Sequence, residues 1–443
     1  MIGEISLQRV LTTEDVENIS LFLKEKDRES PRVFVGRKQI RDHVTGQVLY
    51  LQSKAGPVSC SIVLQGAPGA GKTSLLDQIT KDLEDLDDVH VISFEAGDLN
   101  FVHTVLRKFL EVDKLKVESL SRSYDRKGSA GFSIPWTNIK IGGSKSSSLP
   151  SCYSRVKDNP SELWVVIREE LSKQARDAVF VMLVDEAQNV EPDVGSKINR
   201  VASAVHQALN TEQLKILPIF AGLSDTAKQL GEVGVARGAD GYLPDYVVGS
   251  LTQQEAIEVV IDTIKELKIE NLFESEDLRE LAKILAYASE GWPMHLHHYI
   301  HSLISEVFRY GEFQERGIVD LEKVVSDGHD RRIAYYDARL RNLPVDYLED
   351  TLSDIARSFE TNGTLSSSIL LVKIKTVMVE LGVDFSRDPE NILSALVHNG
   401  VFEISKSGSY RFSIPSFQTY LANDRDEKRA KQVMDETLRT QLG

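Results

Sequence analysis

The chain has 443 residues, 41% of them hydrophobic, which is enough apolar sequence for the cores of about three domains. Acidic residues outnumber basic ones, 67 to 52, and the net charge of -15 disfavours a protein whose whole surface binds nucleic acid. The only cysteines, Cys60 and Cys152, exclude a disulfide scaffold and a four-cysteine zinc site.

The first 250 residues alternate between helix and strand patterns. Residues 12–28 are expected to form a helix capped by Thr12 or Thr13. The uninterrupted apolar run 179–184 is typical of a central parallel strand that is buried on both faces. Further strands are predicted at 59–65, 89–94 and 214–221, and helices at 74–86, 101–116, 160–176 and 197–209. This alternation predicts an α/β fold, a parallel sheet with crossover helices.

After residue 251 the strand patterns give way to helices. Thr252 is expected to begin a helix over 254–267, and helices follow at 276–289, 293–309 and 329–359, the last broken by Pro344. The next patterns are helices at 366–381 and 389–398 and strands at 401–404 and 410–414, joined at Ser407-Gly408. Helices followed by a small hairpin predict a winged-helix-like domain, and the charged last 20 residues predict a peripheral helix or tail.

A complete P-loop pattern, Gly-Ala-Pro-Gly-Ala-Gly-Lys-Thr, lies between a predicted strand and a predicted helix. Glycines allow backbone N–H groups to curl around phosphates, the lysine reaches the β- and γ-phosphates, and the threonine hydroxyl binds Mg²⁺. The helix that follows adds the positive end of its dipole. The expected nucleotide-binding residues of this loop are Gly66, Ala67, Pro68, Gly69, Ala70, Gly71, Lys72, Thr73 and Ser74.

An acidic pair, Asp185-Glu186, ends the apolar run 179–184. After a P-loop, such a pair is expected to act as the Walker B element, with Asp185 holding Mg²⁺ through water and Glu186 polarising the attacking water. The alternative is an acidic pair that faces solvent at the end of a strand. The predicted metal-binding residues are therefore Thr73 and Asp185, and the predicted cofactors are ATP and Mg²⁺.

Together these motifs resemble the AAA+ and STAND superfamily of P-loop ATPases. More narrowly, they resemble the branch of origin-recognition ATPases and of transposition and secretion ATPases with an Asp-Glu-Ala-Gln signature. The resemblance spans about residues 30–310 and rests on four segments: Val33–Arg37, Gly66–Thr73, Val184–Gln188 and Ile219–Thr226. It implies that Val35 and Arg37 lie against the adenine, and that the fourth segment is the sensor 1 strand.

Several further roles are implied only by this resemblance. Asp225 corresponds best to the sensor 1 residue, which is usually asparagine, and Ser224 is the second candidate. The alternative role for Asp225 is a strand-end cap. Arg237 corresponds to an arginine finger for a neighbouring subunit; the alternative is an ordinary surface arginine. The expected catalytic residues are thus Glu186, Asp225 and Arg237.

The segment Gly291-Trp292-Pro293 resembles the turn that begins the sensor 2 helix, which places Pro293 beside the nucleotide. The arginine that often follows this turn is missing, because Met294 and His295 stand there. His295 either touches the nucleotide or packs within its helix together with His297, His298 and His301.

These patterns predict an α/β P-loop (AAA+) core with an α-helical lid and a C-terminal winged-helix-like domain. The expected segments are an N-terminal helical extension (1–31), the ATPase core (32–250), the lid (251–325), the C-terminal domain (326–425) and a charged tail (426–443).

Two regions are candidates for nucleic-acid binding. The predicted helix 389–398 contains no Lys or Arg, so docking to protein is as good an interpretation of the winged-helix-like domain as reading DNA. The basic insert, residues 121–157, has seven basic residues, one acid and interleaved aromatics, which suits DNA or RNA. A protein partner or a solvated loop remain its alternatives. The candidate contacts are Arg126, Lys127, Lys140 and Lys145.

Two functions of different class follow. The first is an ATPase that assembles with ATP into a homo-oligomer and acts on DNA or recruits a DNA-acting effector. The second is a STAND-like switch or scaffold with slow turnover, whose output is a bound partner protein. Transposition, replication initiation, plasmid maintenance and antiphage defence all stay open as pathways.

No apolar run approaches the ~18 residues of a membrane helix, and no signal peptide is expected at residues 1–10. A cytoplasmic protein is therefore expected.

Overall fold

The structure is a computed structural model. It describes residues 3–24, 33–53, 61–95, 165–166, 169, 178–188, 215–232, 245–311, 317–341, 348–359, 363–380, 389–404, 408–423 and 427–442. The basic insert, Arg237 and the helices predicted at 101–116 and 197–209 lie outside these residues, as does nearly all of the one predicted at 160–176.

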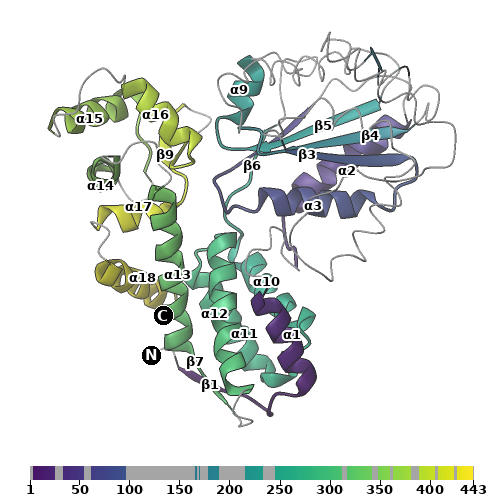
Figure 1. Ribbon diagram of the computed structural model, residues 1–443, viewed down its shortest axis with the longest axis vertical. Helices are drawn as coiled ribbons and strands as arrows, with labels where there is room; N and C mark the ends of the chain where they lie inside the picture. Colours follow the sequence, from purple (N-terminus) through teal and green to yellow (C-terminus); the bar gives the residue numbers. More distant parts are fainter. Residues whose placement is uncertain are drawn as a thin grey trace, which may run out of the picture.

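The core is a five-stranded parallel sheet in the order β3-β4-β5-β2-β6 (Figure 1). Its strands are β2 (Ile62–Gln65), β3 (Val89–Glu95), β4 (Val179–Asp185), β5 (Lys215–Gly222) and β6 (Asp245–Val247). Six consecutive residues of β4 are buried, as its apolar run predicts, and only its last residue, Asp185, is partly accessible. The predicted α/β parallel sheet is therefore confirmed. Because the strands are parallel, their carboxyl ends share one edge of the sheet.

Three described helices accompany this sheet. They are α2 (Lys38–Ser53), α3 (Lys72–Leu83), which begins inside the P-loop pattern, and α9 (Thr226–Glu232), which follows β5. The apolar side of α3 supplies Leu75, Leu76, Ile79 and Leu83 to the core, a spacing of three and four residues that lines one helix face. This packing fixes the start of α3 against the sheet.

The lid contains α10 (Gln253–Glu266), a short 3₁₀ turn η3 (Glu270–Leu272), α11 (Ser275–Ala288) and α12 (Pro293–Gly311). Thr252 caps α10 as expected, in a capping box with Glu255. The N-terminal segment belongs to the lid: β1 (Glu4–Ser6) pairs with β7 (Ile318–Asp320), and α1 (Thr13–Lys24) packs on α12. Within the predicted N-terminal helical extension, Ile5, Leu7, Ile19 and Phe22 pack into the lid core.

One long helix, α13 (Leu321–Arg341), leads from the lid to the C-terminal elements (Figure 1). The expected boundary between residues 325 and 326 falls inside this helix. It is continuous because Val324, Val325 and Ile333 bury one face of it along its length.

The C-terminal unit comprises α14 (Leu348–Ser358), α15 (Ser367–Glu380), α16 (Pro389–His398), the hairpin β8 (Phe402–Ile404) and β9 (Tyr410–Phe412), and α17 (Pro415–Ala422). Its elements match the helices and hairpin predicted there. Phe359, Phe402 and Phe412 form its aromatic centre. The last helix, α18 (Glu427–Leu442), packs on α11 and α13 and buries Leu438, so it is part of the packed structure.

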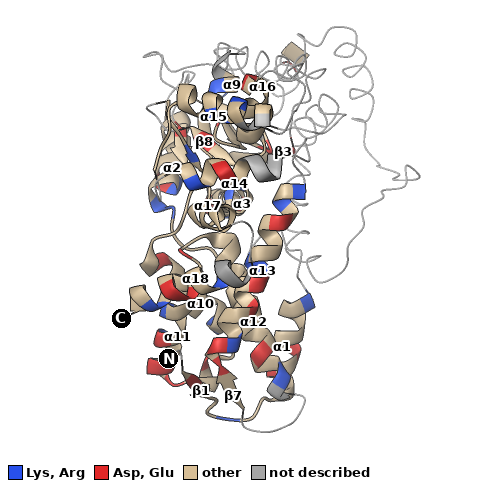
Figure 2. Cartoon of the chain, turned by 90° about the vertical axis from the view of Figure 1, so that its left-hand side faces the viewer, with Lys and Arg blue, Asp and Glu red and all other residues tan. Residues whose placement is uncertain are grey.

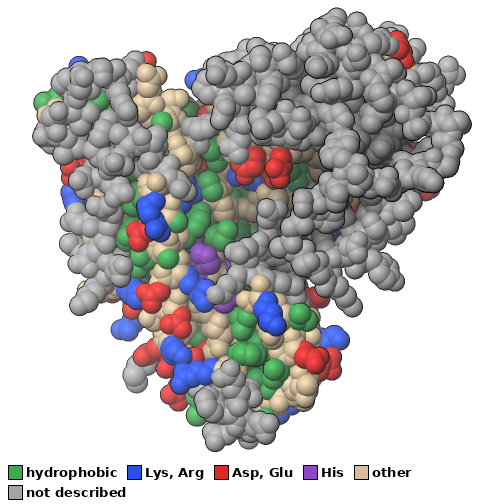
Figure 3. Space-filling model, in the orientation of Figure 1, with side chains coloured by type: hydrophobic (Ala, Val, Ile, Leu, Met, Phe, Trp, Pro, Cys, Tyr) green, Lys and Arg blue, Asp and Glu red, His purple; other side chains and the backbone are tan. Residues whose placement is uncertain are grey.

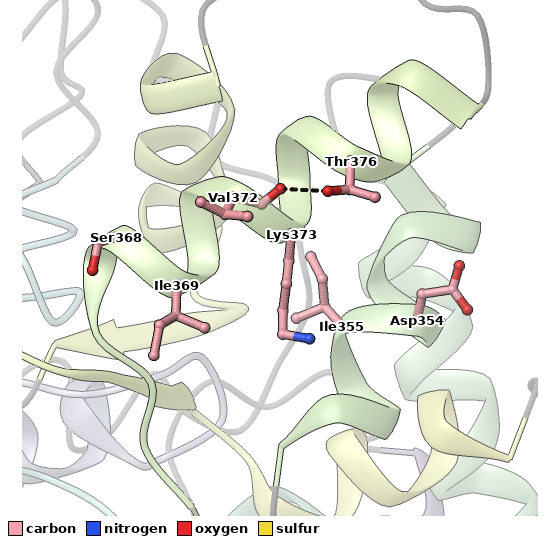
Figure 4. A pocket seen from close by; sticks show the side chains of 7 residues that line it. All are labelled: Asp354, Ile355, Ser368, Ile369, Val372, Lys373 and Thr376. Atoms are coloured by element: carbon pink, nitrogen blue, oxygen red, sulfur yellow. Dashed lines mark hydrogen bonds between the residues drawn. The ribbon is translucent and has the colours of Figure 1, made fainter.

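A cavity of about 640 Å³ opens between α14 and α15 (Figure 4). Ile369, Val372 and Lys373 of α15 face Asp354 and Ile355 of α14 there. Basic and acidic residues are interspersed along the described helices (Figure 2). Among the described residues, no helix is both long and apolar enough to cross a membrane.

The histidines of α12 make the stability of the lid dependent on pH. Burial, together with a smaller contribution from the neighbouring His297, lowers the pKa of His298 from 6.5 to about 4. The folded protein therefore keeps this ring neutral at pH values where the unfolded chain is already protonated. We expect the free energy of unfolding to fall as the pH decreases from about 6.5 to about 4.

Urea unfolding at about pH 7 and about pH 5 would measure this effect. The variant His298→Gln should show a smaller difference between the two pH values, because it removes one of the groups that take up a proton. An equal pH dependence in both proteins would contradict the assignment.

Candidate nucleotide-binding site

The P-loop lies between β2 and α3, and its glycines adopt conformations that other residues rarely adopt. Gly69 and Gly71 have φ values of 80° and 88°, in the left-handed region. A Cβ at Gly66 would overlap the carbonyl of Val248. Lys72 is buried and its Nζ donates to the carbonyls of Gly66 (2.8 Å) and Ala67 (3.3 Å). The loop thus has the curled shape that exposes backbone N–H groups to an anion.

The two predicted metal-binding residues lie together, although 112 positions separate them in the sequence. The Thr73 hydroxyl donates to Asp185 Oδ2 at 2.7 Å, and the backbone N–H of Glu186 donates to Asp185 Oδ1 at 2.8 Å. A hydroxyl beside a carboxylate is the kind of oxygen donor set that Mg²⁺ prefers. These residues therefore fit the metal that the sequence predicts.

Glu186 stands at the end of β4 with a φ of 51°, a left-handed conformation that costs a non-glycine residue about 1–3 kcal/mol. Its side chain accepts a hydrogen bond from Gln188 Nε2. Gln188 is buried, and its Oε1 accepts the backbone N–H of Leu223 at 3.2 Å. Gln188 therefore holds Glu186 against the end of β5. The Asp-Glu-Ala-Gln signature contains this glutamine, but the sequence analysis assigned it no role.

Asp225 lies just beyond β5, immediately before α9. Its Oδ2 accepts Gln229 Nε2 at 2.5 Å, and its carbonyl accepts the Gln229 backbone N–H at 3.0 Å. The hydroxyl of Ser224 donates to the carbonyl of Phe402 at 3.4 Å. Both contacts join Asp225 to α9, and its catalytic role stays a prediction.

Arg37 is placed by a left-handed turn, with φ values of 85° at Gly36 and 57° at Arg37. Its guanidinium donates to the carbonyls of Gly249 and Ser250, at the junction between β6 and α10. Burial lowers the pKa of Arg37, and nearby Glu255 opposes that shift. Arg37 thus joins the segment before the P-loop to the start of the lid. The contact of Val35 and Arg37 with adenine stays a prediction.

The lid turn, residues 291–294, adjoins the P-loop. The backbone N–H of Met294 donates to the Gly69 carbonyl at 3.2 Å. A Cβ at Gly71 would lie 3.9 Å from the ring of Pro293. A Cβ at Gly69 would meet Met294 Cβ at 2.9 Å, the Tyr335 hydroxyl at 3.0 Å and Trp292 Nε1 at 3.2 Å. The structure therefore places Pro293 beside the P-loop, and its contact with a nucleotide stays a prediction.

His295 packs inside the protein. It is 0% exposed, and its ring meets those of Tyr335 and Tyr336 edge-on at centroid distances of 5.9 and 5.5 Å. Burial holds the pKa of His295 well below its usual value, and the charge of Arg332 adds to that shift. These contacts match the packing interpretation of His295. Other histidine side chains do reach the surface. In the space-filling view they lie near the centre, beneath a group of acidic, basic and hydrophobic side chains between the core and the C-terminal unit (Figure 3).

Two contacts with the P-loop were not predicted. The Tyr335 hydroxyl on α13 donates to the Pro68 carbonyl at 2.8 Å. Gly400, in the turn between α16 and β8, sits so close to Pro68 that a Cβ there would lie 2.6 Å from Pro68 Cδ. More than 250 residues separate these partners in the sequence, so no local pattern could have indicated the contacts.

Comparison with known proteins gives a fold and no close relative by sequence. No protein-family model matches the chain, and no curated protein sequence matches it. The Walker-type ATPase of Pyrococcus abyssi superposes with a TM-score of 0.54 at 13% identity, covering 90% of this chain and 99% of that protein. The ORC2 protein of Aeropyrum pernix, solved as ADPNP–ADP complexes, gives 0.50 at 12% identity, covering 95% and 98%. The chain thus shares the overall fold of this Walker-type ATPase and of the ORC2 protein.

Proposed function

We propose that this protein binds and hydrolyses ATP, assembles with ATP into a homo-oligomer, and acts on DNA or recruits a DNA-acting effector. One observation carries the ATPase part. Lys72, Thr73, Asp185 and Glu186 come from two separate segments and meet at the carboxyl edge of the sheet, with Thr73 bonded to Asp185 at 2.7 Å. This edge is where ligands bind in open α/β sheets.

Each residue of this group has a distinct proposed task. The N–H groups of residues 66–74 and Lys72 bind the phosphates, and Thr73 and Asp185 hold Mg²⁺, which neutralises charge that develops on the phosphoryl group. Glu186 orients and polarises the attacking water. Gln188 donates to the Glu186 carboxylate and so helps to hold the group that would accept the proton of this water. Val35, Arg37 and Pro293 are proposed to border the nucleotide, and Asp225 to sense its terminal phosphate.

Assembly and DNA binding rest on residues outside the described structure. Arg237 is proposed to complete the site of a neighbouring subunit as an arginine finger. Arg126, Lys127, Lys140 and Lys145 of the basic insert are proposed to contact DNA phosphates. The ORC2 match supports the fold of this proposal, while the charge of the insert supports its DNA contact.

Steady-state phosphate release tests this function. With ATP and Mg²⁺, we expect turnover per chain to rise with protein concentration, because Arg237 acts between subunits, and to change when duplex DNA is added.

Replacing the four basic residues of the insert by Glu should abolish DNA binding and leave ATP binding intact. Wild-type affinity for DNA should fall steeply with salt, by about 0.9 in log K per log salt for each phosphate neutralised.

A second function, a nucleotide switch with slow turnover that binds a partner protein, is favoured by a specific observation. The lid turn supplies no arginine to the site, and the C-terminal unit packs directly on the P-loop through Gly400. Turnover that is independent of protein concentration and of DNA, with tight ATP binding, would support this alternative over the first.

A further inference from the structure

A chain of contacts runs from the P-loop through α13 to the C-terminal unit. Tyr335 donates its hydroxyl proton to the Pro68 carbonyl and accepts a hydrogen bond from Arg339 Nη1 at 3.2 Å. Arg339 Nη2 donates to the carbonyls of Asn399 (2.9 Å) and Gly400 (2.7 Å). One guanidinium therefore joins the side chain that contacts the P-loop to the turn that packs on it.

The charge of Arg339 has no acidic counterpart in this chain of contacts. Among the described residues, no carboxylate forms an ion pair with it, and its partners are two carbonyls, one hydroxyl and the rings of Tyr335 and Phe417. Burial lowers the pKa of Lys72, and the charge of Arg339 adds to that shift, whereas Glu186 and Asp185 oppose it. Lys72 contacts the P-loop carbonyls and Arg339 contacts the tyrosine that binds the Pro68 carbonyl, so an anion in this loop would be attracted by both cations.

Two buried donors beside the P-loop also lack an acceptor. Arg339 Nε and Trp292 Nε1 are buried and have no hydrogen-bond partner among the described residues. Trp292 and Tyr335 border Gly69 of the P-loop. A Cβ built at Gly69 would lie 3.2 Å from Trp292 Nε1 and 3.0 Å from the hydroxyl of Tyr335, which binds Arg339. A buried donor without an acceptor costs about 1–3 kcal/mol. Phosphate oxygens are strong acceptors, so a nucleotide phosphate would satisfy donors of this kind.

We propose that Arg339 contacts the terminal phosphate of a nucleotide bound in the same chain, and that this contact couples the nucleotide to the docking of the C-terminal unit. The inference rests on the proposed nucleotide binding. It assigns to α13 a phosphate-contacting cation that the lid turn does not supply. Because Arg339 also holds Asn399 and Gly400, the presence or absence of the terminal phosphate changes what the turn between α16 and β8 is bound to.

The test compares the affinities of the full chain for ADP and for a non-hydrolysable ATP analogue, both with Mg²⁺, by calorimetry. The variant Arg339→Gln should reduce the preference for the triphosphate by about tenfold or more, since a hydrogen bond to a charged group is lost, while the affinity for ADP changes little. A purely structural role of Arg339 would lower both affinities together and leave their ratio unchanged.

Two further variants make the result specific. Arg341→Gln removes an exposed arginine two positions along α13, which donates to the Asp337 carbonyl at 3.4 Å, and should keep the wild-type ratio. Arg339→Lys keeps the charge but has neither the Nε donor nor the planar fork, so it should retain only part of the preference. It also serves as the test variant if Arg339→Gln does not fold.

The possible results separate this inference from the function on which it rests. A wild-type ratio in Arg339→Gln, or in Arg339→Lys where that variant replaces it, would overturn the inference, as would a wild-type protein with no preference for the triphosphate. If the wild type binds neither nucleotide, the proposed function itself fails. If the wild type binds both and Lys72→Ala loses both, the site stands and only the ratio decides the role of Arg339.

Discussion

Replacing Lys72 by alanine should abolish measurable ATP binding, with a loss of about 100-fold or more in affinity, because charge-assisted hydrogen bonds to the phosphates disappear. The position of Lys72 in the structure supports this large effect. Lys72 is 8% exposed and its Nζ already lies inside the loop, on the Gly66 and Ala67 carbonyls. A bound phosphate replaces those two carbonyls as partners of a cation that is already in place.

The same helix offers a matched control for this experiment. Lys81 lies in the last turn of α3 and is exposed, so Lys81→Ala removes an equal charge from the same helix without touching the P-loop. Calorimetric titration with ATP and Mg²⁺ should give wild-type affinity for Lys81→Ala. Thermal unfolding without nucleotide shows whether each variant is folded. A folded Lys72→Ala protein that binds ATP as the wild type does would remove the P-loop from the proposed site.

The central sheet and its acidic edge could be predicted because their patterns are local. The apolar run 179–184 and the glycine pattern of residues 66–71 each determine their own conformation, and the structure places β4 and the P-loop where these patterns predict. The short strands β1, β6 and β7 were missed. Each has three residues, too few for an alternating pattern, and β1 pairs with β7, a strand that is distant in the sequence.

Contacts between distant segments limited the prediction of the candidate site. The pairing of Thr73 with Asp185 was expected, because two known motifs locate both residues. Gln188 lies in the Asp-Glu-Ala-Gln signature, which indicates no contact for it, and Tyr335 and Arg339 lie in no motif. The contacts of all three depend on which backbone groups the fold brings to them: Leu223, Pro68 and Gly400. For His295, the sequence allowed two environments, and burial between α12 and α13 matches the packing one.

Replacing Glu186 by glutamine should leave ATP binding intact and reduce turnover by about 10²–10⁴-fold, the usual contribution of a positioned general base. Glutamine has the same size and still offers an oxygen to Gln188 Nε2, so the contact that holds this side chain is retained. The left-handed backbone, with φ of 51°, is equally unfavourable for both residues. The substitution therefore changes the basicity of the side chain and little else.

Phosphate release and nucleotide binding, measured on the same preparations, decide the result. Glu84→Gln, at the exposed end of α3, is the matched control and should turn over ATP like the wild type. Gln188→Leu should lower turnover less than Glu186→Gln does, because Glu186 keeps its carboxylate but loses the partner that orients it. Unchanged turnover in a Glu186→Gln protein that binds ATP would assign the activation of water to another group, since removing the carboxylate would then have cost the reaction nothing.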